Sequence, residues 1–533
     1  MVNLTRRSVC AAGLSSLLLT TFANKLSAQT SAGGPSVVTL ASTKSANRLD
    51  PHVDVKWEVL MVLSAMYDTL VYQDAEGNIV PGLASAWTVS DDGMTYSFTL
   101  RDGVTFHDGA AFDAEAVKFN FDRIQGLGPK SYKASSLIAD VASVEVVSPT
   151  EVKLVMAQAN SSLLSNLSLT FCAMVSPAAA QQWGDEYHMH QVGTGPYKMA
   201  EYEIGDHYKL VKNEDYAWAP GIYGHEGPAL VDELIWRFLP EPSSRSAALL
   251  AGDFDIVFDL LPTSLRRVEA SSDYSVTASH LSGQPAYWFM NTQLAPTDDP
   301  AVRKALIMGV DIEAGVTAIM RGVAPKASGP LSAVTPEYAP EVAGMYSLDK
   351  KGAAALLDEA GWAVGSDGIR AKDGQRLVLK VQMAGWGNSE SFSVLLQSEL
   401  KELGVEVELE MMAYMVGIEA GRNGTHNMLF TGGSGFSVSD SLLPYFLSEN
   451  VESGFAFAKY SDPELDKLLL GAQAASDPAE RLSLYQQAQV MIMEKALILP
   501  IYDYALAIGV SNEIEGLNFG ATGLVPNVYE LEL

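Results

Sequence analysis

The stretch NSESFSVLLQSELKELGVEVEL, residues 388–409, contains the pattern that decides the fold class. Its apolar residues recur at intervals of three and four as far as Leu403, as they do on one face of a helix. Gly404 then stops the helix, because glycine is the usual residue just beyond a helix C-terminus. The following VEVEL alternates apolar residues with glutamates, which predicts a half-buried strand. A helix, a glycine cap and a strand in direct succession are typical of α/β proteins.

Capping signals and alternating patterns elsewhere support this class. Asp299-Pro300 and Asp477-Pro478 each place a carboxylate and a proline where helices begin, and Ser347 is expected to cap a third helix. Alternating apolar residues at 96–100 and 152–156 predict strands. The fold class is therefore α/β or α+β with more than one lobe, and periodicity leaves the strand pairing open.

Length and charge exclude several classes of protein. A chain of 533 residues exceeds what one hydrophobic core usually serves, so two or three domains are expected. The 35 basic and 64 acidic residues give a formal net charge of −29, which disfavours binding to nucleic acid. Two cysteines cannot form a disulfide framework, and the 48% hydrophobic content is sufficient for packed cores.

The first 28 residues have the features of a cleaved secretory signal. They carry three basic residues, no acidic residue, and an apolar run over 9–23 that is shorter than the ~20 residues a membrane-spanning helix needs. The segment TRRSV, residues 5–9, resembles the twin-arginine pattern, and both that route and the general export route stay open. Cleavage would leave a soluble chain of net charge −32 with Cys172 as its single thiol.

Motifs for enzymatic chemistry are missing from the sequence. It has no CxxC, HExxH, GxxxxGK or GxGxxG, and Phe436 stands where the nucleophile elbow would need its last glycine. No catalytic residue, metal site or cofactor is therefore predicted. Three aromatic or glycine-rich segments, residues 287–291, 385–388 and 432–437, instead suggest a small-molecule cleft. Each segment alone is more typical of core aromatics or turn glycines than of a binding cleft.

A series of motifs along the chain resembles the family 5 extracellular solute-binding proteins of ABC importers, the dipeptide/oligopeptide-binding group. The motifs are YDTLV (67–71), PGLASAW (81–87), DDGMTYSFTLRDGV (91–104), GTGPY (193–197), NEDY (213–216), LLAGDFDI (249–256), DPAVRKAL (299–306), LLDEAGW (356–362) and LKELGV (400–405). Together they cover nearly the whole mature chain.

The resemblance implies an α/β, two-lobed periplasmic binding protein fold with hinge strands and an extra inserted subdomain. Residues 29–75, 191–280 and 500–533 would form lobe one, 76–190 the inserted subdomain, and 281–499 lobe two. A periplasmic monomer would capture a small-molecule solute by lobe closure and deliver it to ABC transporter permease subunits in the inner membrane. Neither a cofactor nor catalysis would be required.

By position, the resemblance also implies a set of ligand contacts. These are Trp57 on lobe one and, on lobe two, Tyr287, Trp288, Asn291, Trp386, Gly433, Ser434, Phe436 and Ser437.

One departure from the family pattern bears on the solute. Many peptide-binding members carry Gly-Trp-x-x-Asp in the last of these loops, where the Asp pairs with a peptide's amino terminus. Here Ser434 stands at the Trp position and Ser437 at the Asp position. Losing that counter-charge would weaken capture of a free ammonium group. The favoured solutes are therefore an opine, a glycoside, a glutathione-like compound or a chelate, with a di- or oligopeptide as the alternative.

Two other classes of function remain open at this point. A secreted hydrolase would turn its substrate over, and a chaperone-like peptide binder would bind unfolded chains without a discrete small ligand.

Overall fold

The computed structural model describes residues 34–43, 48–54, 56–385, 387–431 and 437–533. The chain divides into two compact units, Met1–Pro35 and Ser36–Leu533, and the fold described here is that of the second. The predicted export signal, residues 1–28, lies outside the described residues. Within the part of the chain that the structure describes, no helix is both long enough and apolar enough to cross a membrane.

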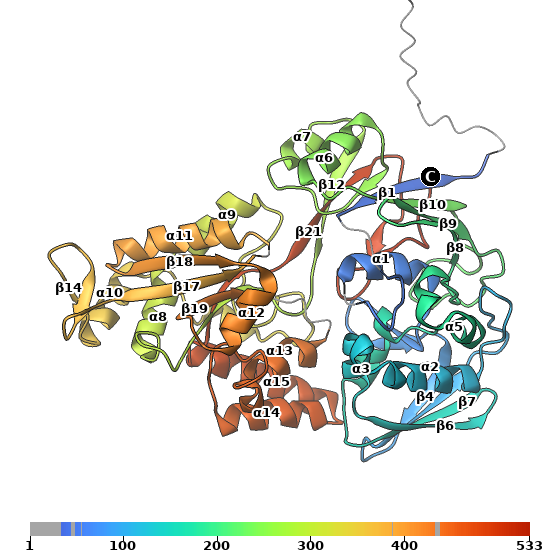
Figure 1. Ribbon diagram of the computed structural model, residues 1–533, viewed down its shortest axis with the longest axis horizontal. Helices are drawn as coiled ribbons and strands as arrows, with labels where there is room; N and C mark the ends of the chain where they lie inside the picture. The colour runs from blue at the N-terminus through green and yellow to red at the C-terminus, as the bar shows by residue number, and fades with distance from the viewer. Residues whose placement is uncertain (1–33, 44–47, 55, 386, 432–436) are drawn as a thin grey trace, which may run out of the picture. The chain divides into compact units, whose positions relative to one another are not determined.

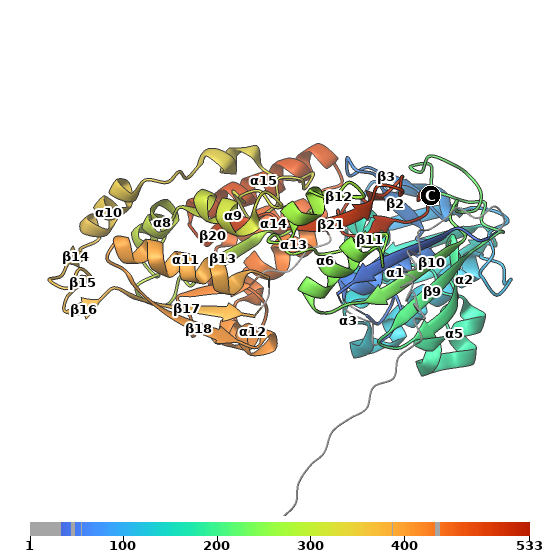
Figure 2. The ribbon, with the colours of Figure 1, turned by 90° about the horizontal axis from the view of Figure 1, so that it is seen from above.

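A mixed seven-stranded sheet forms the centre of lobe one (Figure 2). In spatial order its strands are β12 (Tyr274–His280), β21 (Ala505–Ser511), β11 (Ile256–Val257), β1 (Val37–Ser42), β10 (Glu233–Phe238), β9 (His207–Lys212) and β8 (Tyr197–Glu203). β1 runs parallel to both of its neighbours, β10 and β11, and the other pairs are antiparallel. The N-terminal and C-terminal parts of the chain are therefore joined in one sheet.

The inserted subdomain contains an antiparallel four-stranded sheet. Its strands lie in the order β4 (Ala84–Val89), β5 (Thr95–Leu100), β7 (Glu151–Met156) and β6 (Val141–Ser148). Helix α2 (Ala114–Gly126) contacts β6 and β7. One continuous core cluster includes residues from this sheet, such as Phe98 and Val152, together with residues of lobe one such as Leu40 and Trp236. The subdomain therefore shares its hydrophobic core with lobe one.

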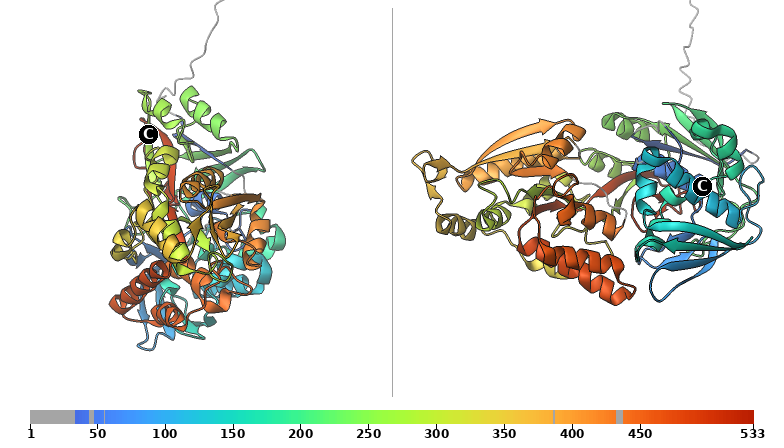
Figure 3. Two further views of the ribbon diagram at one scale, coloured as in Figure 1. Left: turned by 90° about the vertical axis from the view of Figure 1, so that its left-hand side faces the viewer. Right: turned by 60° about the horizontal axis from the view of Figure 1, so that its bottom comes forward.

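Lobe two is built on a five-stranded sheet with helices on both faces (Figure 1). Its strands lie in the order β18 (Glu406–Met412), β17 (Val378–Ala384), β19 (Met428–Thr431), β13 (Ala286–Met290) and β20 (Ile498–Tyr502). One face packs with residues of α8 (Pro300–Gly309), α9 (Ile312–Met320), α10 (Lys350–Glu359) and α11 (Ser389–Glu402). The other face packs with residues of α12 (Tyr414–Arg422), α13 (Val438–Phe446), α14 (Pro463–Ala474) and α15 (Pro478–Glu494), of which α14 and α15 lie side by side (Figure 3).

The remaining elements are short, apart from the first helix and α6. The helices are α1 (Trp57–Met66), α3 (Tyr132–Leu137), α4 (Leu163–Leu167), α5 (Pro177–Trp183), α6 (Pro242–Ala251) and α7 (Leu265–Glu269). The strands are β2 (Val71–Gln73), β3 (Ile79–Pro81), β14 (Ala363–Val364), β15 (Arg370–Lys372), β16 (Gln375–Arg376), β22 (Asn518–Phe519) and β23 (Pro526–Asn527).

The predicted helix starts are mostly confirmed at the level of individual hydrogen bonds. Asp299 accepts from Ala301 N (2.8 Å) and Asp477 from Ala479 N (3.1 Å), so both cap the helices expected of them. The prediction that Ser347 caps α10 is wrong. Asp349 is the N-cap instead, because its side chain accepts a hydrogen bond from Gly352 N at 2.8 Å.

Two chain segments lead from the lobe-two sheet to the lobe-one sheet. One connects β12 to β13, the other connects β20 to β21, and Leu281 N donates to Tyr504 O across them at 2.8 Å. The predicted lobe boundary at residue 500 falls inside β20, all of which pairs within the five-stranded sheet. We call residues 281–285 and 503–504 the connecting segments.

Candidate ligand-binding site

One edge of the lobe-two sheet collects the ends of several strands. The parallel strands β17, β18 and β19 end there at Ala384, Met412 and Thr431. β20 reaches the same edge, because Tyr502 pairs with Ala286 at the start of β13. In open α/β sheets, ligands bind in the crevice outside the carboxyl ends of strands. This edge, from which both connecting segments depart, is therefore the candidate site.

Most of the predicted contact residues belong to segments that leave this edge. Trp386 follows β17, and Gly433, Ser434 and Phe436 follow β19, but all four lie outside the described residues. Trp57 is the first residue of α1, and its side chain is likewise not described. Their contacts with a ligand remain predictions.

Tyr287 and Trp288 lie inside the two cores of lobe two, each with a side chain 0% exposed. Tyr287 belongs to the cluster on the face with α13 and α15, and Gln284 Nε2 donates to its hydroxyl group. Trp288 belongs to the cluster on the opposite face, where it packs edge-on against Phe430 at 5.7 Å between ring centroids. Both side chains thus support the sheet, and their role as ligand contacts is untested.

Asn291 lies at the opposite edge of the same sheet. Its backbone N–H donates to Asn427 O, and Asn427 precedes β19, whereas the candidate site is where β19 ends. Four residues along a strand separate it from Tyr287 by about 13 Å. Its amide group donates to Gly424 O (3.1 Å) and His426 O (3.0 Å). The structure therefore does not bring Asn291 together with the segments that contain Trp386 and Ser437.

Ser437 is the N-cap of α13, since its hydroxyl group accepts a hydrogen bond from Asp440 N at 3.3 Å. Asp440, in the first turn of the helix, pairs with Lys133 of the inserted subdomain at 2.6 Å. The carboxylate of this loop is thus three positions later than in peptide-binding members and already has a cationic partner. Asp440 is therefore already paired and is not a free counter-charge for a peptide's ammonium group.

Several tyrosines that the sequence analysis did not single out gather at this edge. Burial raises the pKa of Tyr445, and Asp440, Tyr287, Tyr414 and Tyr132 raise it further by their proximity. Tyr414 and Tyr132 keep exposed fractions of 42% and 64%. These aromatic rings come from α3, α12 and α13, so a ligand here would meet residues of both the inserted subdomain and lobe two.

The last residue of β20 and the connecting segment after it add two more tyrosines to this group. The rings of Tyr502 and Tyr504 meet edge-on at 5.1 Å between centroids. Burial raises the pKa of Tyr504, and Tyr502, Tyr287 and Tyr414 contribute to the same shift. Both phenols therefore stay neutral and can donate hydrogen bonds at neutral pH.

On lobe one, a buried ionic network holds the turn that precedes α1. Arg123 Nη2 lies 2.6 Å from Asp50 Oδ2, and its Nη1 donates to His52 Nδ1 at 2.7 Å. His52 Nε2 must then carry the proton that it donates to Ala173 O. Burial and the Arg123 charge lower the pKa of His52 to about 4. The network fixes the segment from which residues 54–57 are expected to face lobe two.

A small cavity of about 40 Å³ crosses the boundary between the lobes. It is lined from lobe one and the subdomain by Gln73, Ser161, Ser162, Ser165 and Ala521, and from the connecting segment and lobe two by Ser282, Gly283, Thr335, Pro336, Glu337, Ser437, Val438 and Arg481. Direct contacts also cross here, since Ser161 N donates to Gln473 O at 2.9 Å. Ser437 is the one predicted contact residue among the described residues that line this cavity.

The structure has two lobes that are joined by two paired chain segments. The candidate site lies at the edge of the lobe-two sheet from which those segments depart. These features define a periplasmic binding protein fold. Residues 78–454 match the family described as bacterial extracellular solute-binding proteins, family 5 middle. The chain belongs to this family. It is a solute-binding protein of ABC importers, and members of the family bind solutes without catalysing a reaction on them.

Individual relatives agree over almost the full length. The glutathione-binding protein GsiB of Shigella dysenteriae is 30% identical over 492 residues, which cover 90% of this chain and 91% of that protein. NikA from Brucella suis, solved in complex with Fe(III)-EDTA, has a TM-score of 0.81 and 25% identity over 93% of this chain and 99% of that one. An ABC transporter substrate-binding protein from Sinorhizobium meliloti has a TM-score of 0.75 and 26% identity over the same shares.

Proposed function

We propose that the protein is exported to the periplasm, captures one small polar organic solute at the edge of the lobe-two sheet, and delivers it as a monomer to permease subunits in the inner membrane. The ligand contacts would come from the residues 54–57 segment, the Trp386 loop, the loop of Gly433, Ser434 and Phe436, and the tyrosines described above. The observation that supports this proposal is that β17, β18 and β19 end at one edge of the lobe-two sheet, from which both connecting segments also depart.

Capture follows from differential binding. A solute that touches both lobes interacts more strongly with the closed arrangement than with the open one, so it shifts the population toward closure. A gain of about 1.4 kcal/mol in contacts across the boundary shifts that equilibrium tenfold. The permease can then recognise the closed form. No covalent step is needed.

The solute class that we favour is a carboxylate-bearing compound other than an ordinary free-amine peptide. The carboxylate of Asp440 is paired with Lys133, and Ser437 serves as a helix cap at the position where peptide binders carry an Asp. The ligands of two relatives, the glutathione-binding protein and NikA in complex with Fe(III)-EDTA, are themselves rich in carboxylates. A glutathione-like compound, an opine or a chelate fits this setting, and a glycoside or a di- or oligopeptide is the alternative.

A thermal-shift panel tests the class of solute. Glutathione, an opine, Fe(III)-EDTA, a disaccharide and a dipeptide would each be added to unliganded protein at several concentrations. We expect a concentration-dependent rise in Tm with a carboxylate-rich solute that exceeds the rise with the dipeptide, because binding to the native state alone stabilises it. A dipeptide that raises Tm most would overturn the favoured class, and conversion of any solute to product would overturn the binding-protein mechanism.

A further inference from the structure

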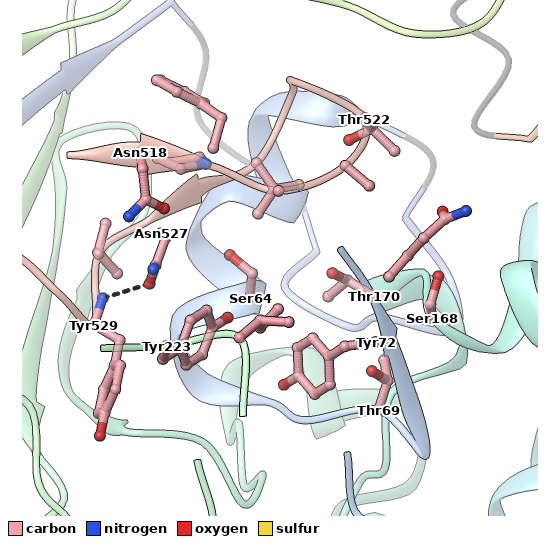
Figure 4. Close-up of a pocket in the computed structure, with 18 of the residues that line it drawn as sticks. Ser64, Thr69, Tyr72, Ser168, Thr170, Tyr223, Asn518, Thr522, Asn527 and Tyr529 are labelled. Carbon is pink, nitrogen blue, oxygen red and sulfur yellow. Dashed lines mark hydrogen bonds between the residues drawn. The ribbon is translucent and has the colours of Figure 1, made fainter. Parts of the chain in front are cut away.

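A second cavity, shown in Figure 4, is lined by residues that do not belong to the lobe-two sheet edge. Its volume is about 530 Å³, within the range typical of small-molecule sites. The lining comes from α1, from the segment that carries β2, from Ser168–Thr170, from Tyr216 and Tyr223, and from the C-terminal residues 518–530. All of these belong to lobe one or the inserted subdomain, so the cavity is complete without lobe two.

The charged side chains of this lining are all carboxylates. They are Asp68, Asp74, Glu76 and Glu530, and no lysine, arginine or histidine is found among the described residues around the cavity. Carboxylates gathered around a low-dielectric cavity focus a negative potential into it. The cavity therefore favours a cation over an anion.

The hydrogen-bond partners of two of these carboxylates are neutral groups. Asp68, 2% exposed, accepts from Tyr72 Oη (2.7 Å) and Trp218 Nε1 (3.0 Å) as well as from Thr194 and Tyr216. Burial raises the pKa of Asp68, and these four hydrogen bonds oppose the rise. All four donors are neutral, so they stabilise the ionised carboxylate without cancelling its charge.

Glu530 is held in the same way at the other end of the cavity. Its carboxylate accepts from Asn518 Nδ2 (2.7 Å), from Asn527 Nδ2 (2.6 Å) and from Gly224 N. Asn527 Oδ1 also accepts a hydrogen bond from Tyr529 N, and this bond fixes the turn that contains Asn527 and Tyr529 (Figure 4). The donors around Glu530 are again neutral amides, and its position in the lining is fixed by three contacts.

Aromatic side chains accompany the carboxylates in the lining. Tyr72, Tyr216, Tyr223, Tyr529 and Phe519 contribute to the lining, and Tyr72 and Tyr223 are labelled in Figure 4. Aromatic faces attract cations through their quadrupole and also cover an apolar body. Burial and the Asp68 carboxylate raise the pKa of Tyr72, so the ring stays neutral.

We infer that this cavity is a second binding site, separate from the site at the sheet edge, for a small organic cation that has an amine and an apolar or aromatic body. The carboxylates would attract the ammonium group, and the tyrosine rings would contact the body. Among the described residues, the site takes no lining residue from lobe two. Gln73 and Ala521 are the two lining residues that it shares with the inter-lobe cavity.

The test compares two probes of equal shape that differ in charge. Tyramine carries an ammonium group where 4-propylphenol carries a methyl group. By isothermal titration calorimetry on the full mature protein, we expect tyramine to bind at least about tenfold more tightly than 4-propylphenol, with an affinity that falls as salt is added. Equal affinities, or no heat from tyramine at millimolar concentration, would overturn the inference.

Variants of the lining residues test whether tyramine binds in this cavity. In the double variant E76Q/E530Q we expect tyramine affinity to fall about fivefold or more while that of 4-propylphenol stays unchanged. Glu532→Gln, an exposed carboxylate outside the lining, is the matched control and should leave both affinities unchanged. Ser64→Phe fills the cavity from α1 and should abolish binding of both probes, with circular dichroism confirming the fold. Tyramine binding that survives both pocket variants would place it elsewhere and contradict the inference.

Discussion

Lys133 Nζ lies 2.6 Å from Asp440 Oδ2, and this ion pair connects α3 of the inserted subdomain to α13 of lobe two. The two side chains are only 14% and 22% exposed. Solvent and salt therefore screen the pair less than they screen a surface ion pair. Since Asp440 lies in the first turn of α13, three residues after the N-cap Ser437, this contact couples the start of α13 to the inserted subdomain.

Removing the cation should weaken both stability and capture. In Lys133→Met the partly buried Asp440 loses its counter-charge, which we expect to cost about 1–2 kcal/mol in the free energy of unfolding. We also expect the affinity for the native solute to fall severalfold, as measured by calorimetry. Lys130→Met is the matched control, because Lys130 pairs with Asp185 within the subdomain, where both are well exposed. Equal losses in the two variants would refute a special role for the pair between lobes.

Ser437→Asp should give the protein affinity for free-amine dipeptides. Aspartate is as good an N-cap as serine, so α13 should remain intact. The added carboxylate would restore the counter-charge of peptide-binding members, and we expect affinity for alanyl-leucine to rise about tenfold or more. Ser439→Asp, two positions further on, is the control and should produce no such gain. A folded S437D protein that gains no dipeptide affinity would contradict the assignment of this position.

Asp503, in a connecting segment, should make stability depend on pH. Its side chain is 2% exposed, and burial raises its pKa to about 6, partly opposed by the hydrogen bond that Ala333 N donates to Asp503 Oδ2 at 3.0 Å. A raised folded-state pKa gives stability that is present below the unfolded value near 4 and is lost as the pH rises through about 6. Asp503→Asn should therefore be more stable than the native protein at pH 7.5, by up to about 3 kcal/mol.

The same substitution should lose its advantage in acid. Chemical denaturation at pH 4 and at pH 7.5 measures the difference between the two proteins at each pH. We expect the difference to approach zero at pH 4, since Asp503 is then protonated in the folded protein. A difference that does not change with pH would show that the carboxyl group does not titrate in this range.

Substitutions of two tryptophans should distinguish a residue that supports the sheet from a residue that contacts the ligand. Trp288, with a side chain 0% exposed, lies in the core, so Trp288→Ala should lower the free energy of unfolding by about 3–5 kcal/mol. Trp386 stands between two glycines in the loop after β17, and Trp386→Ala is expected to weaken solute binding with little loss of stability. Denaturation curves and calorimetry on both variants measure the two effects. A Trp386→Ala variant that binds as well as the native protein would remove this residue from the site.

Local signals in the sequence predicted the elements well but not the edge at which they meet. The helix and strand over 388–409 are confirmed as α11 and β18, because apolar spacing and the glycine stop are properties of consecutive residues. Asn291 shows the limit of such reasoning. It stands four residues from Tyr287 in the sequence, yet it lies at the opposite edge of the lobe-two sheet. The reason is that strand β13 runs from the edge that holds the candidate site to the other edge.

The tyrosines at the candidate site show the same limit, because residues that are far apart in the sequence come together there. Tyr132, Tyr414, Tyr445 and Tyr504 are up to 372 positions apart in the chain, and only the folded structure brings the segments of the last three together with α3 of the inserted subdomain. Only the start of a helix directly after a strand, as at Tyr414, could have drawn attention to one of them. Ser437 was predicted from its motif position, and its role as a helix cap required the structure.

Native mass spectrometry of gently purified mature protein tests the central claim most directly. We predict a 1:1 complex between one protein chain and one small organic solute, and release of that solute with its mass unchanged. We also predict that re-adding the released solute to unliganded protein restores the complex and raises Tm. A protein that carries no small molecule and is stabilised by none across a broad panel, or that releases a chemically converted product, would contradict the account.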